Sequence, residues 1–538
     1  IPRWPFDKFA TGDRSLGTQM KATGEVMAID RTFEAALQKA VRGLEIGKRS
    51  LLWEDPKWAG QKLDLSPHDE RIWRLTSAIR GGMTSTEVSL KTGVDPWFTR
   101  SLERIVKMER RLLVEDLSSD LMYQAKRLGF SDDQIGTLSD LLPEQVRTQR
   151  QEWGIRPVYK MVDTCAAEFE AQTPYFYSTY EQENEAEPLA GEKAIVIGSG
   201  PIRIGQGIEF DYCSVHAAWA LQQQGVKSVL VNSNPETVST DFDTSDRLYF
   251  EPLDQESIRD IIYNETPKDT DDPQPPASVV QFGGQTAINL SQILDRAGLP
   301  IMGSSAESID TASDRHLFEE FLAGIGIPNP PGATVADLQQ ARSVARTIGY
   351  PILVRPSYVL GGRAMEIVQS DGELERFMEE ALSAGEGRRV LIDKYFEGRE
   401  VEIDAVCDGE SVLIPGIMEH VERAGVHSGD SMAIYPGLTL TEEEIATIVD
   451  YTTRIGLALQ IKGLMNIQYV ALGGPAYRSP DTGNGGAESE IYVIEVNPRS
   501  SRTIPFISKV TGVPMVKLAV NAMRGKSLAE QGYEGGLW

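Results

Sequence analysis

The residues best suited to hold a metal ion are Gln468, Glu495 and Asn497. Glu495 and Asn497 stand two apart in the strand-like string Ile-Glu-Val-Asn-Pro, so their side chains face the same side. One carboxylate and two amide oxygens suit Mg²⁺, which keeps its other positions for water and phosphate oxygens. The sequence therefore predicts a magnesium site, and the alternative is a set of half-exposed polar residues on strands.

A second group that suits phosphate chemistry is the string Arg355-Pro-Ser-Tyr-Val-Leu-Gly361-Gly362-Arg363 between two predicted strands. The strand-borne Arg355 supplies charge, and the pair Gly361 and Gly362 lets backbone N–H groups approach phosphate oxygens closely. An ordinary β-turn is the alternative, and the string alone does not separate the two interpretations.

His427 lies in the loop Gly425-Val-His-Ser-Gly-Asp430 and is one of 5 histidines in the chain. Beside Ser428 and glycines it could position a small anionic substrate. A solvent-exposed loop histidine is the alternative, and the residues leave both open.

A Gly-rich turn, Gly198-Ser-Gly-Pro-Ile-Arg-Ile-Gly205, follows an apolar strand but does not fit a dinucleotide site. Its third glycine comes two residues late. The next strand ends at Asn232, where an NAD site needs an acidic residue for the ribose. We predict a tight turn that brings backbone N–H groups near a small anion.

These groups require three kinds of domain to position them. Residues 66–155 read as all-helical, with Asp95 as a helix cap, and they hold no catalytic cluster, which favours a scaffold or contact module. Residues 1–60 contain one predicted helix, with Thr32 as its cap and Gly47 as its stop. Residues 156–190 read as a connector.

From residue 193 the pattern changes to βα units, which predict a small doubly wound parallel sheet with strands Ala194–Ile197, Ser228–Val231 and Ser278–Gln281. From residue 306 an α+β domain is predicted, and Gly473–Glu490 reads as a long hairpin insertion. Its predicted strands are Ile352–Arg355, Glu366–Val368, Val390–Asp393, Val401–Ala405, Val412–Met418, Tyr469–Leu472 and Ile491–Val496. The predicted domains are 1–60, 61–155, 156–190, 191–305 and 306–538.

The composition excludes several classes of function. The net charge of −26 repels nucleic acid and anionic lipid, so phosphate must be held by local arginines and N–H groups. Three widely spaced cysteines without a CxxC pair predict a reducing compartment and no disulfides. No run reaches the roughly 18 apolar residues of a membrane span, and no signal peptide is visible. Because the chain begins at Ile1, we expect a piece of a longer protein.

Several long strings resemble the carbamoyl-phosphate synthase large-subunit family over nearly the whole chain. They are Ile204 to Cys213, Asn234 to Asp241, Gln281 to Gln285, Arg355 to Arg363, His420 to Asp430 and Glu495 to Arg499, and Asp163 to Phe169 is similar to the family's connector. The resemblance implies a helical oligomerisation domain, a Rossmann-like pre-ATP-grasp domain and an ATP-grasp domain.

The resemblance also implies an activity. The family's large subunit is a tandem duplication, and its second half phosphorylates carbamate to carbamoyl phosphate for pyrimidine and arginine or urea synthesis. This chain resembles the tail of the first half, the oligomerisation domain and the second half, so the first ATP-grasp site and the allosteric domain are expected to be missing. Another ATP-grasp carboxylate–amine ligase and a catalytically silent scaffold half remain as alternatives.

The implied cofactors are ATP and Mg²⁺, with Mn²⁺ as a substitute and K⁺ as an additional ion. The implied partners are a glutaminase small subunit or domain, the first synthetase half, and further copies of the chain bound through the helical domain. Neither nucleic acid nor a membrane is expected as a partner. The implied location is the cytoplasm, or the mitochondrial matrix in a eukaryote.

Residue roles follow from the same resemblance. Arg315 and Arg355 correspond to phosphate-contacting arginines, and Gln468, Glu495 and Asn497 to magnesium ligands, the first two of which also contact the nucleotide. Catalytic roles fall on Arg355, His427, Arg499 and Arg502. The nucleotide site further takes Gly361 and Gly362 over the phosphates, the backbone of Lys394 and Phe396 at the adenine, Glu400 at the ribose, and Gly425, Val426, His427 and Ser428 along its wall.

Overall fold

The structure is a computed structural model of the chain. It describes residues 1–538 except 10, 48–49, 269–271, 357–364, 385–389, 427–430 and 474–488. The described residues form two compact units. Unit 1 holds residues 1–203, 221–278 and 296–300, and unit 2 holds residues 204–220, 279–295 and 301–538. Within the described ranges, no helix is both long and apolar enough to cross a bilayer.

The first part of unit 1 is helical, as the sequence predicts. Thr32 caps the first helix by accepting from the amide of Ala35, and Asp95 caps α4, which begins at Pro96. The first helix ends at Gly43 and not at Gly47, because the amide of Leu44 already closes the last turn on Ala40. The helices are α1 (Phe33–Gly43), α2 (Arg71–Arg80), α3 (Ser85–Thr92), α4 (Pro96–Val114), α5 (Ser119–Arg127), α6 (Asp132–Ser139) and α7 (Pro143–Glu152).

The described residues of unit 1 also form a six-stranded sheet in the order β3-β4-β7-β6-β5-β8. The predicted parallel pairing is present, since β4 with β7, β7 with β6 and β6 with β5 all run parallel. Residues 156–190 are more than the predicted connector, because they supply two strands of this six-stranded sheet. The strands are β3 (Val158–Met161), β4 (Tyr175–Thr179), β5 (Lys193–Ile197), β6 (Lys227–Asn232), β7 (Arg247–Phe250) and β8 (Ala277–Val279), and α9 (Gln255–Glu265) follows β7.

The Gly-rich turn after β5 is occupied by groups of unit 1 itself. The amide of Gly200 donates to Oδ1 of Asn232 at 3.0 Å, and the Glu45 carboxylate lies so close that a Cβ on Gly200 would be 2.1 Å from its Oε1. Gly200 has φ +68, which glycine adopts without strain. The turn is tight as predicted, and the Glu45 carboxylate that lies against it is paired with Arg203 of the same turn at 2.5 Å.

A chain of buried ion pairs joins the helical region to α9. Arg150 of α7 contacts Asp132 at 2.9 Å and Asp260 at 2.9 Å, and Asp260 also contacts Arg147 at 2.8 Å. Lys126 of α5 lies between Asp132, at 3.0 Å, and Glu256, at 2.5 Å. The charges therefore alternate in sign along the order Arg147, Asp260, Arg150, Asp132, Lys126 and Glu256.

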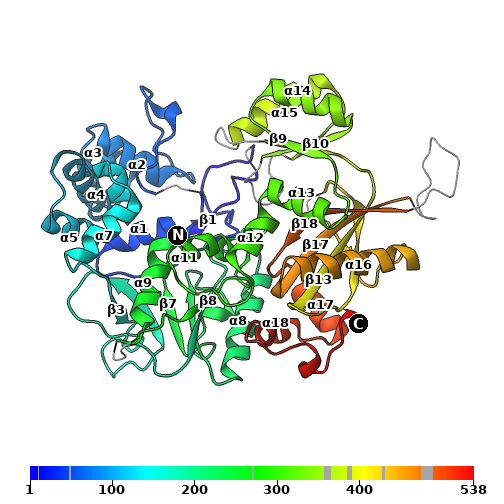
Figure 1. The fold of residues 1–538 in the computed structure, drawn as a ribbon. Helices are drawn as coiled ribbons and strands as arrows, with labels where there is room; N and C mark the ends of the chain where they lie inside the picture. The colour runs from blue at the N-terminus through cyan, green and yellow to red at the C-terminus, as the bar shows by residue number, and fades with distance from the viewer. Residues whose placement is uncertain are drawn as a thin grey trace. The chain divides into compact units, whose positions relative to one another are not determined.

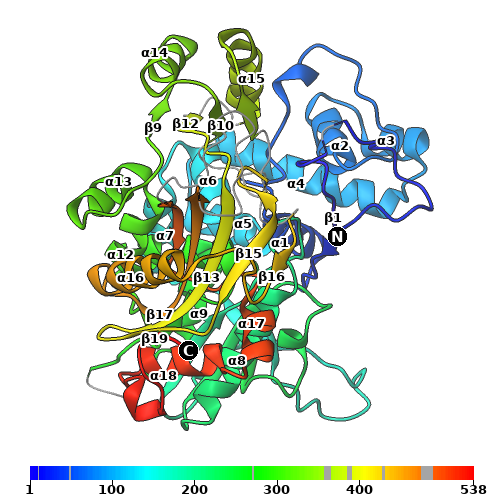
Figure 2. The ribbon, with the colours of Figure 1, turned by 90° about the vertical axis from the view of Figure 1, so that its right-hand side faces the viewer.

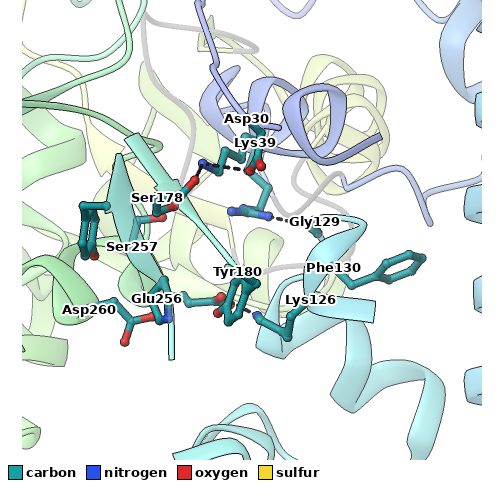
Figure 3. Close-up of a pocket in the computed structure, with 13 residues that line it drawn as sticks. Asp30, Lys39, Lys126, Gly129, Phe130, Ser178, Tyr180, Glu256, Ser257 and Asp260 are labelled. Carbon is teal, nitrogen blue, oxygen red and sulfur yellow. Dashed lines mark hydrogen bonds and ion pairs between the residues drawn. The ribbon is translucent and has the colours of Figure 1, made fainter. Parts of the chain in front are cut away.

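A cavity of about 20 Å³ lies beside this chain of ion pairs, and Figure 3 shows Tyr180, Lys126 and Glu256 at its edge. Such a volume has room for about one water molecule. The buried hydroxyl of Tyr180 has no hydrogen-bond partner within the described part of the chain. Nearby, Lys39 contacts Asp30 at 3.1 Å.

Unit 2 contains a four-stranded antiparallel sheet in the order β11-β10-β12-β9, counted over its described residues. Its strands are β9 (Gly332–Val335), β10 (Ile352–Pro356), β11 (Glu366–Val368) and β12 (Val390–Lys394). The helices α14 (Leu338–Ile348) and α15 (Asp371–Ala384) pack on this sheet, and Figure 1 shows them together above it.

A seven-stranded sheet forms the larger part of unit 2 where the chain is described. The predicted strand Val412–Met418 is two strands, because Pro415 supplies no N–H and the chain turns at Gly416. The strands are β13 (Arg399–Asp408), β14 (Val412–Ile414), β15 (Ile417–Arg423), β16 (Ala433–Ile434), β17 (Lys462–Leu472), β18 (Glu490–Asn497) and β19 (Gly536–Leu537). The long central strands are visible in Figure 2.

Helices cover this sheet according to the alternation of β13. Val401, Ile403 and Ala405 face one way and pack with Ile448 and Ile455 of α16 (Glu442–Ala458) in one hydrophobic core. Glu400, Glu402 and Asp404 alternate with these residues and face the other side of the sheet. The helix α18 (Met515–Met523) contacts β13 and β17, and α17 (Ile504–Thr511) precedes it in the chain.

Candidate functional site

The register of three neighbouring strands brings polar residues together in two rows on one face of the large sheet. Glu402 of β13 pairs with Gln468 of β17, which pairs with Glu495 of β18. In the next row, Asp404 pairs with Asn466, which pairs with Asn497. Because residues two apart on a strand share a face, all six side chains point the same way.

The three residues predicted as metal ligands lie within these rows. Asn497 donates from Nδ2 to Oε1 of Glu495 at 3.1 Å and accepts from Arg499 at 3.2 Å. Among the described residues, no group of three or more His, Cys, Asp or Glu side chains is placed to hold a metal ion. A site built from Gln468, Glu495 and Asn497 contains one carboxylate and two amides, and these hard oxygens fit Mg²⁺.

Two predicted phosphate arginines meet on one buried carboxylate. Arg315, at the start of α13 (Arg315–Gly324), donates to Oδ1 of Asp393 at 2.8 Å. Arg355 of β10 lies 3.7 Å from the other oxygen of Asp393 and 3.9 Å from Oε2 of Glu495. Arg355 therefore lies between the buried acid and the proposed metal site.

The two arginines after β18 lie next to the same rows. Arg499 is half-buried, burial lowers its pKa, and it donates to Gln285 at 3.3 Å and to the carbonyl of Ser500 at 2.8 Å. Arg502 lines a cavity of about 210 Å³ together with Glu402, His420, Ser431, Ala433, Thr503 and Phe506. The Arg502 guanidinium therefore faces a cavity, and the Arg499 guanidinium contacts Asn497 of the second row.

The residues predicted at the adenine follow β12. The side chain of Lys394 is turned to the carbonyls of Gly349 at 3.1 Å and Tyr350 at 2.9 Å, and its backbone N–H donates to Pro331 at 2.8 Å, so neither group is available to a base. The ring of Phe396 contacts the ring of Tyr492, with centroids 4.6 Å apart. Phe396 follows the end of β12 and Tyr492 lies on β18. Their rings form an aromatic contact beside the backbone predicted to meet the adenine.

The wall predicted along the nucleotide is described only in part. Gly425 has φ +100, and a Cβ there would lie 2.7 Å from the ring of Tyr395, so a larger residue would be strained and crowded. Val426 is 38% exposed. The predictions for Gly361, Gly362, His427 and Ser428 fall outside the described residues.

A buried histidine and two acids lie at the centre of this face. His420 contacts Glu402 at 3.0 Å, Ser431 at 2.8 Å and Glu400 at 3.5 Å. Burial lowers the pKa of His420, but the hydrogen bond with Glu402 and the two carboxylate charges outweigh it, so the pKa is raised. Burial raises the pKa of Glu400 to about 7 although the charge of His420 opposes the rise.

Asp404 is the acid of the second row and is fully buried. Burial and the neighbouring Glu402 raise its pKa to about 7, and Thr503 donates to it at 2.5 Å. Asn466 donates to both acids, at 2.8 Å to Glu402 and at 3.0 Å to Asp404. The polar side chains are therefore held by one another as well as by the strands.

Sequence reasoning missed several members of this cluster. The period of two in Glu400, Glu402 and Asp404 is a visible signal, since three acids alternate with apolar residues on one strand. Asn466 stands two residues before Gln468 and carries the same signal. No pattern in the sequence indicates that Asp393 meets Arg315, because the two come from separate elements.

Three family models match successive parts of the chain. The large-chain oligomerisation domain of carbamoyl-phosphate synthetase matches residues 25–154. The pre-ATP-grasp domain of carbamoyl phosphate synthase matches residues 190–311, and the ATP binding domain of its L chain matches residues 314–531. These matches define the class, a multidomain ATP-grasp protein with a helical oligomerisation domain, and they confirm the predicted fold class.

Relatives extend the match to the whole chain. The carbamoyl phosphate synthase large chain of Thermomicrobium roseum is 56% identical over 542 residues, which cover 100% of this chain and 49% of that protein. The large chain of Caldanaerobacter subterraneus subsp. tengcongensis is 52% identical and covers 100% and 48%. The chain belongs to the carbamoyl phosphate synthase large-chain family, and it spans about half the length of these relatives.

Among solved structures, the biotin carboxylase domain of 2-oxoglutarate carboxylase from Hydrogenobacter thermophilus, in complex with MgADP, ADP and bicarbonate, has a TM-score of 0.49. Its sequence identity is 22%, and the similarity covers 64% of this chain and 72% of that one.

Proposed function

We propose that this chain phosphorylates carbamate with ATP and Mg²⁺ to give carbamoyl phosphate. The observation that carries the proposal is the pair of polar rows on β13, β17 and β18, which sets Gln468, Glu495 and Asn497 beside Arg355 and Arg499. Oxygen ligands next to guanidinium groups suit a reaction in which negative charge is spread over the oxygens of a moving phosphoryl group.

The individual roles are part of this proposal. Arg315 and Arg355 contact the nucleotide phosphates, Phe396 and the backbone of Lys394 meet the adenine, and Glu400 meets the ribose. Gly361, Gly362, Gly425, Val426, His427 and Ser428 complete the nucleotide site, while His427, Arg499 and Arg502 hold the substrate. Gln468, Glu495 and Asn497 would hold Mg²⁺, which would neutralise part of the charge on the phosphate oxygens. We assign no residues to K⁺.

The cavity beside Arg502 supports a small acceptor. Its volume of about 210 Å³ lies below the roughly 300 Å³ at which pockets for larger organic ligands begin. The Arg502 guanidinium favours an anion, and the Glu402 carboxylate that also lines the cavity is paired with His420 at 3.0 Å. A carbamate ion meets both conditions better than the larger acceptors of other carboxylate–amine ligases.

We further propose that the chain self-associates through its helical region and works with a glutaminase partner and a first synthetase half. The helical region exposes several large apolar side chains, at Leu90, Trp97, Leu113, Val114 and Leu142. Sedimentation velocity of Val114→Glu should show a shift toward the monomer. Leu438→Glu, an equally exposed residue of unit 2, should leave assembly unchanged, and equal behaviour of the two variants would count against this surface.

The proposed activity is tested by running it backwards. The purified chain is supplied with carbamoyl phosphate, MgADP and no other substrate, and ATP is measured with a coupled luciferase reaction. We expect ATP formation that requires Mg²⁺ and both substrates. No ATP from a folded chain that binds ADP would refute the proposal.

A further inference from the structure

Asp393 has no assigned role, yet it lies at the point where two arginines of unit 2 converge. It sits on β12 opposite Leu353 of β10, and Arg355 follows two residues further on the same face of β10. Arg315 reaches the same carboxylate from the first turn of α13. Three elements far apart in the sequence therefore place their charged groups at one buried position.

The carboxylate holds its two arginines differently. Arg315 is fixed by several contacts, at 2.8 Å to Asp393, at 2.5 Å to Glu319 and at 3.3 Å to the carbonyl of Pro330. Arg355 approaches Asp393 no closer than 3.7 Å, which is beyond a hydrogen bond. Arg355 is thus attracted by charge without being locked in place, as far as the chain is described.

Asp393 itself has little freedom to move. A Cβ on Gly332 of the neighbouring strand would lie 2.1 Å from its Oδ1 and 2.6 Å from the carbonyl oxygen of Ile392. The side chain is 9% exposed. Burial raises the pKa of Asp393, and the charges of Arg315 and Arg355 act against that rise. The two arginines are what a buried carboxylate at this position needs as counter-charges.

We propose that Asp393 is a positioning residue that fixes Arg315 and holds Arg355 within reach of the transferring phosphoryl group without binding it. Arg355 also lies 3.9 Å from Oε2 of Glu495, so a small movement takes it from one acid to the other. A phosphate that arrives between them competes with Asp393 for Arg355 alone, while Arg315 stays where it is. The inference rests on the proposed function of this site.

Asp393→Asn tests the inference, because it keeps the size of the side chain and removes its charge. Binding of ADP and of adenosine is measured by titration calorimetry, and ATP formation from carbamoyl phosphate and ADP is measured in parallel. We expect ADP to bind about 3- to 10-fold more tightly, since phosphate no longer competes with a carboxylate. Adenosine affinity should stay unchanged, and turnover should fall at least tenfold because Arg355 is no longer positioned.

Glu319→Gln is the matched control, since it removes the charge of the second carboxylate that contacts Arg315. The Glu319 side chain is 29% exposed. It should leave turnover within about twofold. Equal losses of ADP and adenosine binding in Asp393→Asn, or unchanged turnover, would overturn the inference. If wild-type protein forms no ATP, the proposed function fails. The affinities for ADP and for adenosine still test whether Asp393 acts on the phosphate-binding arginines.

A second measurement covers the case in which Asp393→Asn does not fold. Arg315→Gln and Arg355→Gln are compared by thermal unfolding. If Arg315 is the fixed partner, Arg315→Gln lowers the melting temperature markedly and Arg355→Gln changes it little. A larger loss from Arg355→Gln would contradict the division of roles between the two arginines.

Discussion

The chain of buried ion pairs in unit 1 makes a sharp prediction for Asp260→Asn. Asp260 of α9 contacts both Arg150 and Arg147 of α7, and the Arg150 and Asp260 side chains are 0% and 8% exposed. The change keeps the shape of the residue and leaves two buried guanidinium groups with one carboxylate fewer. A second ion pair between the same two helices, Glu144 with Arg259, is exposed, since the Glu144 side chain is 58% exposed.

The expected cost follows from this difference in burial. Removing one partner of a buried ion pair costs about 3 to 5 kcal/mol. Arg150 keeps Asp132 at 2.9 Å, so the lower value of about 3 kcal/mol applies. Glu144→Gln should cost about 0 to 1 kcal/mol, because water screens the exposed pair. For a folding unit of the size of unit 1, about 3 kcal/mol corresponds to a fall in melting temperature of roughly 6 to 12 °C.

The assay is differential scanning calorimetry of both variants at low and high salt, with hydrogen exchange of α5 to α7 as a local readout. We expect the large shift in Asp260→Asn at both salt concentrations, and the small shift in Glu144→Gln to vanish at high salt. Amides of α5 to α7 should lose protection only in Asp260→Asn. Equal shifts in the two variants, or a shift in Asp260→Asn that salt removes, would refute the reasoning from burial.

Three further outcomes are expected. Glu495→Gln should lower ATP formation on the order of 10²- to 10³-fold with an unchanged melting temperature, because it removes the only carboxylate of the proposed metal site, and near-normal turnover would exclude Glu495 from that site. The pKa of Asp404 is raised to about 7 from 3.8, so its contribution favours folding at low pH and is lost as pH rises from about 4 to about 7. Asp404→Asn should therefore reduce the loss of unfolding free energy between pH 5.5 and 8, followed by calorimetry, by about 2 kcal/mol. Thr32→Ala removes the cap of α1 and should cost about 1 kcal/mol in a denaturant titration, and no change would show that the cap is not needed.

Local patterns predicted those features that depend on neighbouring residues. The caps at Thr32 and Asp95 are examples, since helix ends are set within a few residues. The boundary errors have the same origin. Gly47 is a plausible stop, but hydrogen bonds at Leu44 had already closed the helix, and Pro415 divided a run that is apolar on both sides.

Contacts between distant elements were beyond sequence reasoning. Asp393 meets Arg315 from 78 residues away, and only the folded sheet brings them together. The connector 156–190 became two strands because β7 offered an edge, which no local pattern in the connector shows. The raised pKa of His420 likewise depends on Glu400 and Glu402 from another strand.

The alternating ion pairs between α7 and α9 restrict where segments of homologous proteins can be recombined into one chain. Consider a chimera in which one homologous protein supplies the helical region and another supplies the sheet. The charges that meet must then match in sign, in order and in degree of burial, because one mismatch leaves a buried ion unpaired. A junction between α7 and α9 takes the ion-pair partners from different parents, whereas a junction after residue 265 takes them all from one parent. We therefore expect functional chimeras of this family to have no junction between α5 and α9.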